Sequence, residues 1–350
     1  MKDWEENVRK VVPYTPGEQP RDTHVVKLNT NENPYPPAPG VRKVLQSMDV
    51  DSFRLYPDPA AQMLTEALAH YYGIDKDQVF VGVGSDDVLS VAFLTFFNSS
   101  RPLLFPDITY SFYPVWADVY RIPYRKVPLD EQFHIRPEDY RQENGGIVFP
   151  NPNAPTSCLE TLDTVEEILK ANRDVVVIVD EAYIDFGGES ALKLIDQYDN
   201  LLVVQTFSKS RSMAGVRIGY AMGCKELIQA MNDVKYSINS YTMSRPAILL
   251  GTAAVADEAY FKQCIRRIIA TREKTEECLL ELGFTFPKPY ANFIFAKHPQ
   301  QNGKELFASL RKEHIYVRHF DQPRIEDYLR ITIGTDEQME TLFKALEKML

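Results

Sequence analysis

Short apolar segments alternate with longer amphipathic ones between about residues 52 and 239, and this alternation limits the fold more than any other feature. The apolar runs are VFVGVG (79–84), PLLFP (102–106), GIVFPN (146–151), VVVIVD (175–180), LLVVQTF (201–207) and VRIGYAM (216–222). Continuous apolar strands imply burial on both faces, as in a parallel sheet covered by helices. Segments between them, such as SDDVLSVAFLTFF, begin with Ser or Asp and carry apolar residues at helical spacing. The pattern predicts an α/β fold with a mostly parallel sheet.

The flanking regions differ from this central part. Residues 1–50 are rich in Pro, Asn and charge, so we expect an N-terminal arm that packs on another part of the protein, with a mobile tail as the alternative. Residues 51–240 form the predicted large domain. Residues 241–350, which include helix-like GKELFASLRKEH and strand-like YLRITIGT, form a predicted smaller α/β domain. The 350-residue length is sufficient for two domains.

Charge and cysteine content exclude several classes of protein. The net charge is −10 and no Lys/Arg run occurs, which argues against a nucleic-acid binder. The four cysteines are far apart and lack metal-ligand spacing, so we expect reduced thiols and no metal. The N-terminus lacks the apolar core of a signal peptide, and the apolar runs are too short for a membrane span. We therefore expect a cytoplasmic protein that acts on small molecules.

Polar residues follow the apolar runs, where an open α/β sheet binds its ligands. The residues nearest these ends are Gly84-Ser85-Asp86, Tyr110, Asn153, Asp180 with Tyr183, and Lys209. Together they supply the groups that a pyridoxal 5′-phosphate site requires. By itself the Gly-x-Gly turn would equally suit a dinucleotide fold or a structural turn.

Lys209 and Asp180 carry most of this hypothesis. A lysine in an apolar site can become neutral and attack an aldehyde, although a solvated loop lysine is an equal alternative when Lys209 is considered alone. Thr206, Ser208 and Arg217 lie close to it in sequence and would suit a phosphate. A carboxylate at Asp180 can keep a pyridine nitrogen protonated. A helix N-cap or an ion pair is the alternative role.

The remaining candidates are aromatic, amide and guanidinium groups. Tyr183 and Asn153 could donate to the pyridine 3-oxygen, and Tyr110 could stack on the ring. Arg318 and Arg330 interrupt apolar strand-like runs and need anionic partners. These partners are either structural carboxylates or the carboxylate or phosphate of a substrate.

These motifs together resemble the histidinol-phosphate aminotransferases, a group within the fold-type I pyridoxal-phosphate enzymes with a large, seven-stranded type of sheet. The similar segments are LNTNENPYPP (28–37), LYPDP (55–59), VGVGSDDVL (81–89), PDITYSFY (106–113), NPNAPT (151–156), VDEAYIDF (179–186), TFSKSRSMAGVRIGY (206–220), ANFIF (291–295) and YLRITIGT (328–335). They cover nearly the whole chain in the expected order. The lysine and aspartate segments are the most specific.

The resemblance implies a role for each candidate. Lys209 would carry the cofactor as a Schiff base, Asp180 would pair with the pyridine nitrogen, and Tyr110 would stack on the ring. The implied 3-oxygen contacts are Asn153 and Tyr183, and the implied phosphate ligands are Gly84, Ser85, Asp86, Thr206, Ser208 and Arg217. Tyr56 would reach the phosphate of the neighbouring subunit, which implies a homodimer. Arg318 and Arg330 would bind substrate anions, while Tyr14 and the segment containing Asn33 would close over the substrate. The arm of residues 1–50 would pack on the small domain and on the partner subunit.

One departure and several alternatives accompany the resemblance. The family usually reads NPNNPTG, whereas this chain has Ala154 and Ser157 at two of those positions. The implied reaction moves the amino group of histidinol phosphate to 2-oxoglutarate. Within the same fold, an aromatic-amino-acid aminotransferase or a threonine-phosphate decarboxylase are alternatives. An NAD-dependent dehydrogenase lacks support, because Asp87 occupies the third glycine position. A non-enzymatic scaffold is disfavoured because Lys209 and Asp180 are both present.

Overall fold

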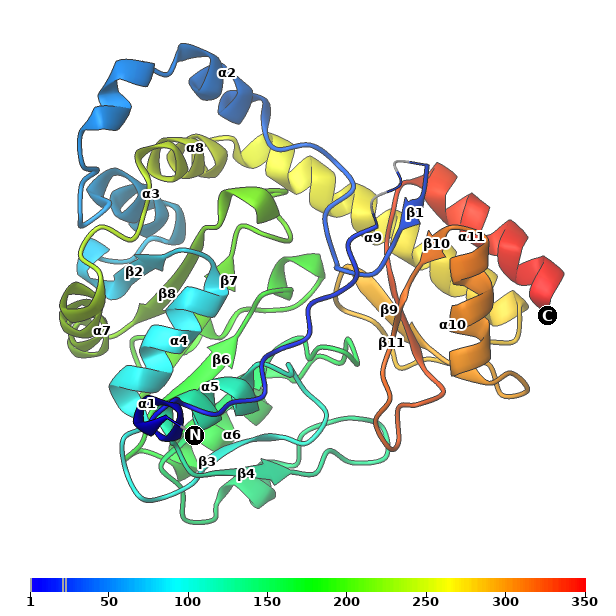
Figure 1. The fold of residues 1–350 in the computed structure, drawn as a ribbon, viewed down its shortest axis with the longest axis horizontal. Coiled ribbons are helices and arrows are strands. Elements are labelled where there is room, and N and C mark those ends of the chain that lie inside the picture. Colours follow the sequence, from blue (N-terminus) through cyan, green and yellow to red (C-terminus); the bar gives the residue numbers. More distant parts are fainter. Residues whose placement is uncertain (1, 21, 23) are drawn as a thin grey trace.

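The computed structural model describes residues 2–20, 22 and 24–350. Figure 1 shows a large domain around one broad sheet, a smaller domain beside it and an N-terminal segment that runs between them. None of the described helices is long and apolar enough to cross a membrane.

The large sheet has seven strands, and its construction confirms the predicted fold class. Their spatial order is β2 (Val79–Gly82), β8 (Gly219–Gly223), β7 (Leu201–Thr206), β6 (Val177–Asp180), β5 (Gly146–Pro150), β3 (Leu103–Pro106) and β4 (Tyr124–Val127). Only β8 runs antiparallel to its neighbours. Every residue of β5, β6 and β7 is buried, which explains their uninterrupted apolar sequences.

Strand β4 was not among the apolar runs that predicted the sheet. It lies at the sheet edge, and Arg125 and Lys126 within it are exposed. An edge strand with charged residues resists pairing with other chains, and the same charges conceal it from a search for apolar runs.

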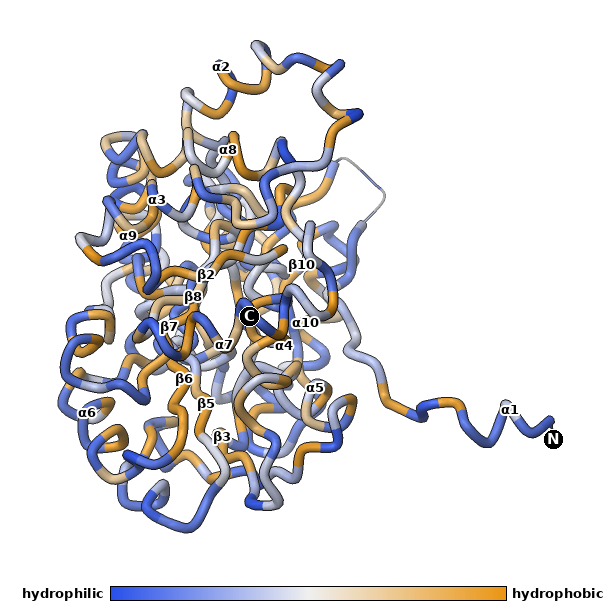
Figure 2. The backbone as a smooth tube through the Cα atoms, turned by 90° about the vertical axis from the view of Figure 1, so that its left-hand side faces the viewer, coloured by the Kyte–Doolittle hydropathy of each residue, from blue (hydrophilic) through white to orange (hydrophobic). Residues whose placement is uncertain are grey.

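Helices cover both faces of this sheet, because successive strand residues point to opposite sides. Ile178 packs in a cluster with α4 (Ser85–Phe96), α5 (Tyr113–Tyr120) and α7 (Lys225–Ile238). Its neighbours Val177 and Val179 pack in the other cluster, with α3 (Gln62–Tyr72), α6 (Leu162–Ala171) and α8 (Arg245–Ala256). Figure 2 shows the apolar strands enclosed within the molecule.

The small domain has its own core. Its antiparallel sheet has the order β11 (Arg318–His319), β12 (Leu329–Thr332), β9 (Phe293–Ala296). Three helices pack with it: α9 (Glu258–Glu281), α10 (Gly303–Lys312) and α11 (Asp336–Met349). Short 3₁₀ helices occur at η1 (Val50–Arg54), η2 (Lys76–Gln78), η3 (Pro137–Tyr140), η4 (Ile184–Phe186), η5 (Ala191–Leu194) and η6 (Ala214–Val216).

The expected boundaries at residues 50 and 240 divide segments that share one core. Helix α2 (Pro39–Ser47) packs against α8, and Val41 and Ile248 belong to the large-domain cluster. Both helices need the same apolar partner, so both lie on the large-domain side. The chain passes into the small-domain core along α9, whose Phe261 and Ile265 belong to that second cluster.

The N-terminal arm contacts both domains. It begins with α1 (Asp3–Glu6), and Figure 2 shows that the first residues extend away from the body of the molecule. Further along, β1 (Val26–Lys27) pairs in parallel with β10 (Ile315–Tyr316) of the small domain. Asn33 then donates to the carbonyl oxygens of Lys209 and Ser210 in the large domain.

Candidate active site

A cavity lies beyond the carboxyl ends of the parallel strands, and three parts of the chain line it. The arm contributes Tyr14 and Asn29–Asn31, and the small domain contributes Arg318, Phe320 and Arg330. The large-domain residues on the cavity include Ser85, Asp86, Thr109, Tyr110, Ala154, Pro155, Asp180, Tyr183, Thr206, Ser208, Lys209 and Arg217. Most of the residues singled out in the sequence therefore face one space.

Lys209 and Asp180 face this same cavity from neighbouring strands. Lys209 follows β7, and its Nζ lies 3.1 Å from the carbonyl oxygen of Thr30 on the arm. Asp180 ends β6, and the Tyr113 hydroxyl donates to its Oδ2 at 2.9 Å. Burial raises the pKa of Asp180 to about 6, and the bonds from Tyr113 and the Ala182 N–H oppose that shift. A cationic partner in the cavity would favour the ionised carboxylate.

A cradle for an anion lies at the start of α4. Gly84 has φ +89°, and the free N–H groups of Ser85 and Asp86 follow it in the first helical turn. Gly219 of β8 approaches so closely that a Cβ there would lie 2.3 Å from the Ser85 nitrogen. Glycine at this position keeps the turn in contact with the sheet.

Hydroxyl and guanidinium groups complete the cradle. Thr206 Oγ1 donates to Ser208 Oγ at 3.0 Å, and Arg217 Nη1 lies 3.4 Å from the same Ser208 oxygen. Arg217 Nη2 lies 3.4 Å from Asp86 Oδ2. Tyr110 donates to the other Asp86 oxygen at 2.8 Å. This donor set, with backbone amides, hydroxyls and one fixed cation, fits a phosphate group.

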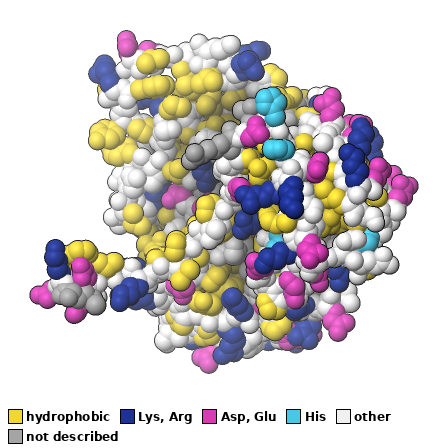
Figure 3. Space-filling view, turned by 45° about the vertical axis from the view of Figure 1, so that its right-hand side comes forward, with side chains coloured by type: hydrophobic (Ala, Val, Ile, Leu, Met, Phe, Trp, Pro, Cys, Tyr) yellow, Lys and Arg dark blue, Asp and Glu magenta, His cyan; other side chains and the backbone are white. Residues whose placement is uncertain are grey.

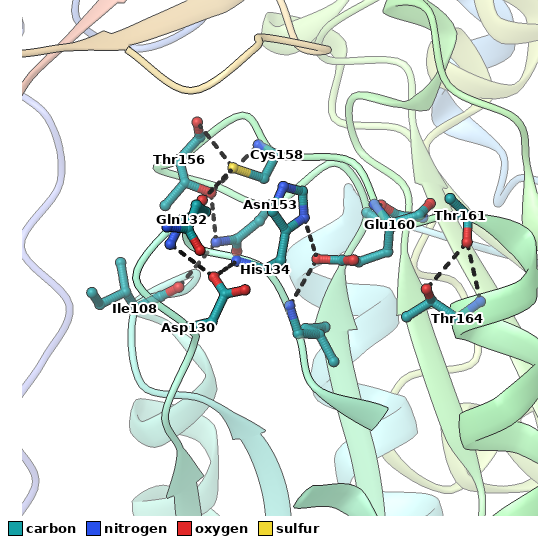
Figure 4. A network of polar contacts seen from close by, with 12 residues as sticks. Ile108, Asp130, Gln132, His134, Asn153, Thr156, Cys158, Glu160, Thr161 and Thr164 are labelled. Carbon is teal, nitrogen blue, oxygen red and sulfur yellow. Dashed lines mark hydrogen bonds and ion pairs between the residues drawn. The ribbon is translucent and has the colours of Figure 1, made fainter. Parts of the chain in front are cut away.

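Tyr183 and Asn153, the two expected contacts to the 3-oxygen, lie differently. Tyr183 faces the cavity, and its hydroxyl accepts from Asn31 Nδ2 at 2.9 Å. Asn153 is buried outside the cavity lining, and its Nδ2 donates to the Ile108 carbonyl and to Thr156 Oγ1. Figure 4 shows these bonds within the loop network. The contact of Asn153 with the 3-oxygen stays a prediction; in this structure its amide group bonds to the Ile108 carbonyl and to Thr156 and does not line the cavity.

Arg318 and Arg330 form a cross-strand pair without a carboxylate. They are register partners in the β11–β12 ladder, so both side chains lie on the face that lines the cavity. Arg330 Nη2 donates to the Asn29 carbonyl at 3.0 Å, while its Nε is buried without a partner. Within the described part of the chain, neither arginine forms an ion pair. Like charges placed opposite each other are destabilising, so the pair favours an anionic ligand.

The remaining residues predicted from the sequence lie on the arm and on the surface. Tyr14 faces the cavity, and its ring stacks on Phe112 with centroids 4.4 Å apart. The Asn33 side chain lies outside the cavity and bonds to the backbone beside Lys209. Tyr56 is 78% exposed and stacks on Tyr241, away from the cavity of its own chain.

Two buried residues were missed in the sequence. Tyr113 bonds to Asp180, and Asn31 joins Tyr183 to the small domain through Thr332. Asn31 lies within the LNTNENP segment and Tyr113 within PDITYSFY, so both motifs contained a signal. No group of three or more His, Cys, Asp or Glu among the residues described could hold a metal ion.

The sequence is similar to known proteins over nearly its whole length. Residues 23–346 match the family described as aminotransferase class I and II. A protein named histidinol-phosphate aminotransferase from Pseudomonas putida (strain W619) is 54% identical over 343 residues, with coverage of 98% of this chain and 99% of that protein. Its namesake from Lactococcus lactis subsp. cremoris (strain MG1363) is 51% identical over 347 residues, with coverage of 99% and 98%.

Solved structures show the same fold at low sequence identity. The histidinol-phosphate aminotransferase of Clostridium acetobutylicum aligns with a TM-score of 0.85 at 22% identity, over 92% of this chain and 98% of that one. The Sinorhizobium meliloti enzyme, solved in complex with pyridoxal-5′-phosphate, aligns with a TM-score of 0.84 at 21% identity, over 93% and 91%.

Proposed function

The chain belongs to the class I and II aminotransferases, and from this premise we propose that it transfers the amino group of histidinol phosphate to 2-oxoglutarate. The products are imidazole-acetol phosphate and glutamate, and the reaction is a step of histidine biosynthesis. One observation carries the proposal: a lysine and a buried carboxylate face two unpaired arginines across a single cavity. The names of relatives more than 50% identical over nearly the whole chain support the same substrate.

The large-domain side of the cavity would hold pyridoxal 5′-phosphate. When bound, this cofactor supplies a ring that withdraws electrons from the substrate carbon. Asp180 would face the ring nitrogen, Tyr183 the 3-oxygen and Tyr110 one ring face. The cradle of Gly84, Ser85, Asp86, Thr206, Ser208 and Arg217 would hold the phosphate.

Lys209 would perform the proton transfer. Its amine would hold the cofactor and would be released when the substrate amine binds. The free amine would then take the proton from the substrate carbon that bears the amino group. Nζ lies 3.1 Å from the Thr30 carbonyl oxygen, so the arm would orient the amine when it is free. Asn33 fixes the backbone of the same lysine.

The small-domain side would bind the anionic ends of both substrates. Arg318 and Arg330 would bind the phosphate of the donor and the carboxylate of the acceptor, because paired guanidinium forks suit both groups. Tyr14, stacked on Phe112 at the cavity wall, would cover the rest of the substrate. The arm and the arginines would thereby exclude water from the reacting atoms.

A second copy of the chain would complete the assembly as a cytoplasmic homodimer. Exposed apolar side chains gather over α2 and η1, as the upper left of Figure 3 shows. They include Leu45, Val50, Phe53, Leu55 and Tyr56. Contiguous apolar surface of this kind marks a protein interface. Tyr56 projects from this surface and would reach the phosphate in the partner's cavity.

A donor panel tests the substrate. Cofactor-loaded protein is supplied with 2-oxoglutarate and with histidinol phosphate, histidinol, phenylalanine or threonine phosphate, and glutamate formation is followed. Because the arginine pair binds the donor phosphate, we expect kcat/KM for histidinol phosphate to exceed that for histidinol by about 100-fold or more. Equal rates with phenylalanine, or release of carbon dioxide from threonine phosphate, would contradict the proposal.

A further inference from the structure

The hairpin that carries the two arginines reaches across to the large domain. Strands β11 and β12 place Arg318 and Arg330 opposite each other, and residues 320–328 connect the strands. In Figure 1 this loop extends from the small domain to the segment between β3 and β5. Its position determines how far the arginines lie from the opposite wall of the cavity.

Arg324 bonds this loop to the large domain. Its Nη1 lies 3.2 Å from Asp107 Oδ2, and its Nη2 donates to the carbonyl oxygens of Leu129 at 3.2 Å and Asp130 at 2.6 Å. Gln322 Nε2 adds a bond to the Asp107 carbonyl at 3.2 Å. We call the bonds of Arg324 to these three large-domain residues the Arg324 clamp.

The clamp ends beside the wall that faces the arginines. Asp107 directly precedes Ile108, Thr109 and Tyr110, and the last two line the cavity. Asp107 Oδ1 accepts from the N–H groups of Ile108 and Leu129, so the carboxylate is held on its own side. The clamp therefore joins the arginine hairpin to the strand end that carries Tyr110.

The same loop also makes apolar contacts with the large domain, but these contacts alone would not fix its position. Ile325 is 1% exposed and belongs to the large-domain core cluster, and Tyr328 packs edge-on to Phe133. Such contacts are non-directional and tolerate small sliding movements. A planar fork that bonds to one carboxylate and two carbonyls has a defined orientation. The apolar contacts keep residues 320–328 on the large domain, and the Arg324 guanidinium fixes their exact position there.

Arg324 also has an unfavourable backbone conformation. Its φ is +74°, a left-handed region that favours glycine. A side chain with no role beyond stability would be better replaced by glycine there. Strained residues of this kind persist where their contacts serve a function.

We propose that Arg324 is a positioning residue for substrate binding. Its clamp holds the β11–β12 hairpin at the distance at which Arg318 and Arg330 bind the anionic groups of both substrates. Arg324 itself contacts no substrate. The proposal rests on the proposed function, because it assigns the arginine pair to substrate anions.

Two variants and one matched control test the clamp in the full-length, cofactor-loaded protein. Arg324→Gly removes the fork and the backbone strain, and Arg324→Gln removes only the charge and the fork. The control is Asp321→Asn. Asp321 lies in the same loop as Arg324, but its exposed ion pair is with Lys304 of α10, within the small domain. Steady-state kinetics with both substrates, inorganic phosphate binding, thermal unfolding and amide hydrogen exchange are measured.

We expect both Arg324 variants to raise KM for both substrates about tenfold, with kcat within about twofold, because the loss affects ground-state and transition-state binding alike. Inorganic phosphate should bind more weakly by a similar factor, and amides of residues 315–330 should exchange faster. Arg324→Gly should unfold no earlier than the wild type. Asp321→Asn should change none of these quantities.

The outcomes separate the two proposals. Unchanged KM, phosphate affinity and exchange in both Arg324 variants would overturn the clamp. A fall in melting temperature of Arg324→Gly that accounts for its loss of activity would do the same, because it would show a merely structural role. Failure of the wild-type protein to use histidinol phosphate would refute the proposed function, while phosphate binding and exchange would still decide on the clamp.

Discussion

The two walls of the cavity differ in how their charges are satisfied. On the large-domain wall Asp180 accepts from Tyr113 and Arg217 pairs with Asp86, while Lys209 donates to an arm carbonyl, as Arg330 does on the other wall. On the small-domain wall Arg318 and Arg330 face each other with no carboxylate partner among the residues described. One wall is organised before a ligand arrives, whereas the other requires an anion.

This difference matches the two kinds of occupant that the reaction needs. A cofactor that remains bound is best served by a preorganised wall, because no reorganisation then accompanies each turnover. Substrates that enter and leave twice per cycle need a wall that binds charge without retaining it. Unpaired arginines raise the free energy of the empty site, and substrate binding relieves that repulsion. Each prediction below tests one wall against the other.

Lys209→Ala should have the largest effect, because it removes the acid–base group from the preorganised wall. We expect glutamate formation by the cofactor-supplied protein to fall by at least about 10⁴-fold, with the fold retained. The matched control is Lys193→Ala, since Lys193 is exposed and pairs with Glu189 on the surface. Residual turnover within about tenfold of the wild type would remove Lys209 from the mechanism.

Asp180→Asn tests whether the buried Asp180 carboxylate on the large-domain wall needs a cationic partner. In cofactor-free protein, the folded state holds a proton on Asp180 between pH 3.8 and about 6 that the unfolded chain has released. Wild-type stability should therefore fall as pH rises through this window, and the loss should persist above it. We expect Asp180→Asn to be more stable by up to about 3 kcal/mol above the window and equal to the wild type below it.

The cofactor should reverse this order. A protonated pyridine nitrogen would pair with the ionised carboxylate, so bound cofactor should stabilise the wild type more than Asp180→Asn. Urea unfolding at several pH values, with and without pyridoxal 5′-phosphate, measures both effects. The same pH slope in both proteins would show that Asp180 is not the group that titrates.

Arg330→Met tests the small-domain wall, where we expect the substrate anions to bind. Loss of a charge-assisted contact should lower kcat/KM about 100-fold for both substrates. The substrate-free protein should hold or gain stability, because a half-buried cation that lies opposite Arg318 and has no carboxylate partner among the residues described is removed. Thermal unfolding with and without inorganic phosphate, beside steady-state kinetics, checks both. Arg311→Met, which breaks an exposed pair with Glu18, is the control.

A loss of stability in Arg330→Met would contradict the difference between the two walls. If Arg330→Met lost stability in proportion to activity, Arg330 would be a structural residue. The comparison between a satisfied and an unsatisfied wall would then fail. Phosphate should stabilise the wild type but not the variant, and equal stabilisation of both would point to an anion site elsewhere.

The sequence predicted the preorganised wall better than the other one. Side chains at strand ends can be placed from sequence, because the carboxyl ends of parallel strands meet at one edge of the sheet. Asp180 and Lys209 are such residues, and both lie on the cavity. Arg318 and Arg330 were recognised as needing anions, but the choice between a structural carboxylate and a substrate depended on tertiary contacts.

Loops and connections were less predictable. In the loop after β5, sequence cannot tell which of two adjacent residues faces the cavity, and it is Ala154 rather than Asn153. The bond from Tyr113 to Asp180 depends on the docking of α5 against the sheet. Arg324 is distant in sequence from Asp107, so their contact could not be inferred without the fold.

Ser157 offers the smallest and most specific test, because it lies where the two walls are joined. Its φ is +64°, and its Oγ accepts from the N–H groups of Tyr290 at 3.0 Å and Ala291 at 2.9 Å. Tyr290 also donates to the Ser157 carbonyl, so only the Ala291 N–H would lose its partner without the hydroxyl. Ala291 leads into β9, which pairs with the strand that carries Arg330.

Two substitutions at this position separate backbone strain from hydrogen bonding. Ser157→Ala keeps the left-handed backbone and loses the acceptor, so it should lower the free energy of unfolding by about 1–3 kcal/mol. Ser157→Gly also loses the acceptor but relieves strain of roughly 1 kcal/mol, so it should be the more stable variant of the two. Chemical denaturation measures this difference. A glycine variant no more stable than the alanine variant would show that the backbone is unstrained and that the hydroxyl alone joins the two walls.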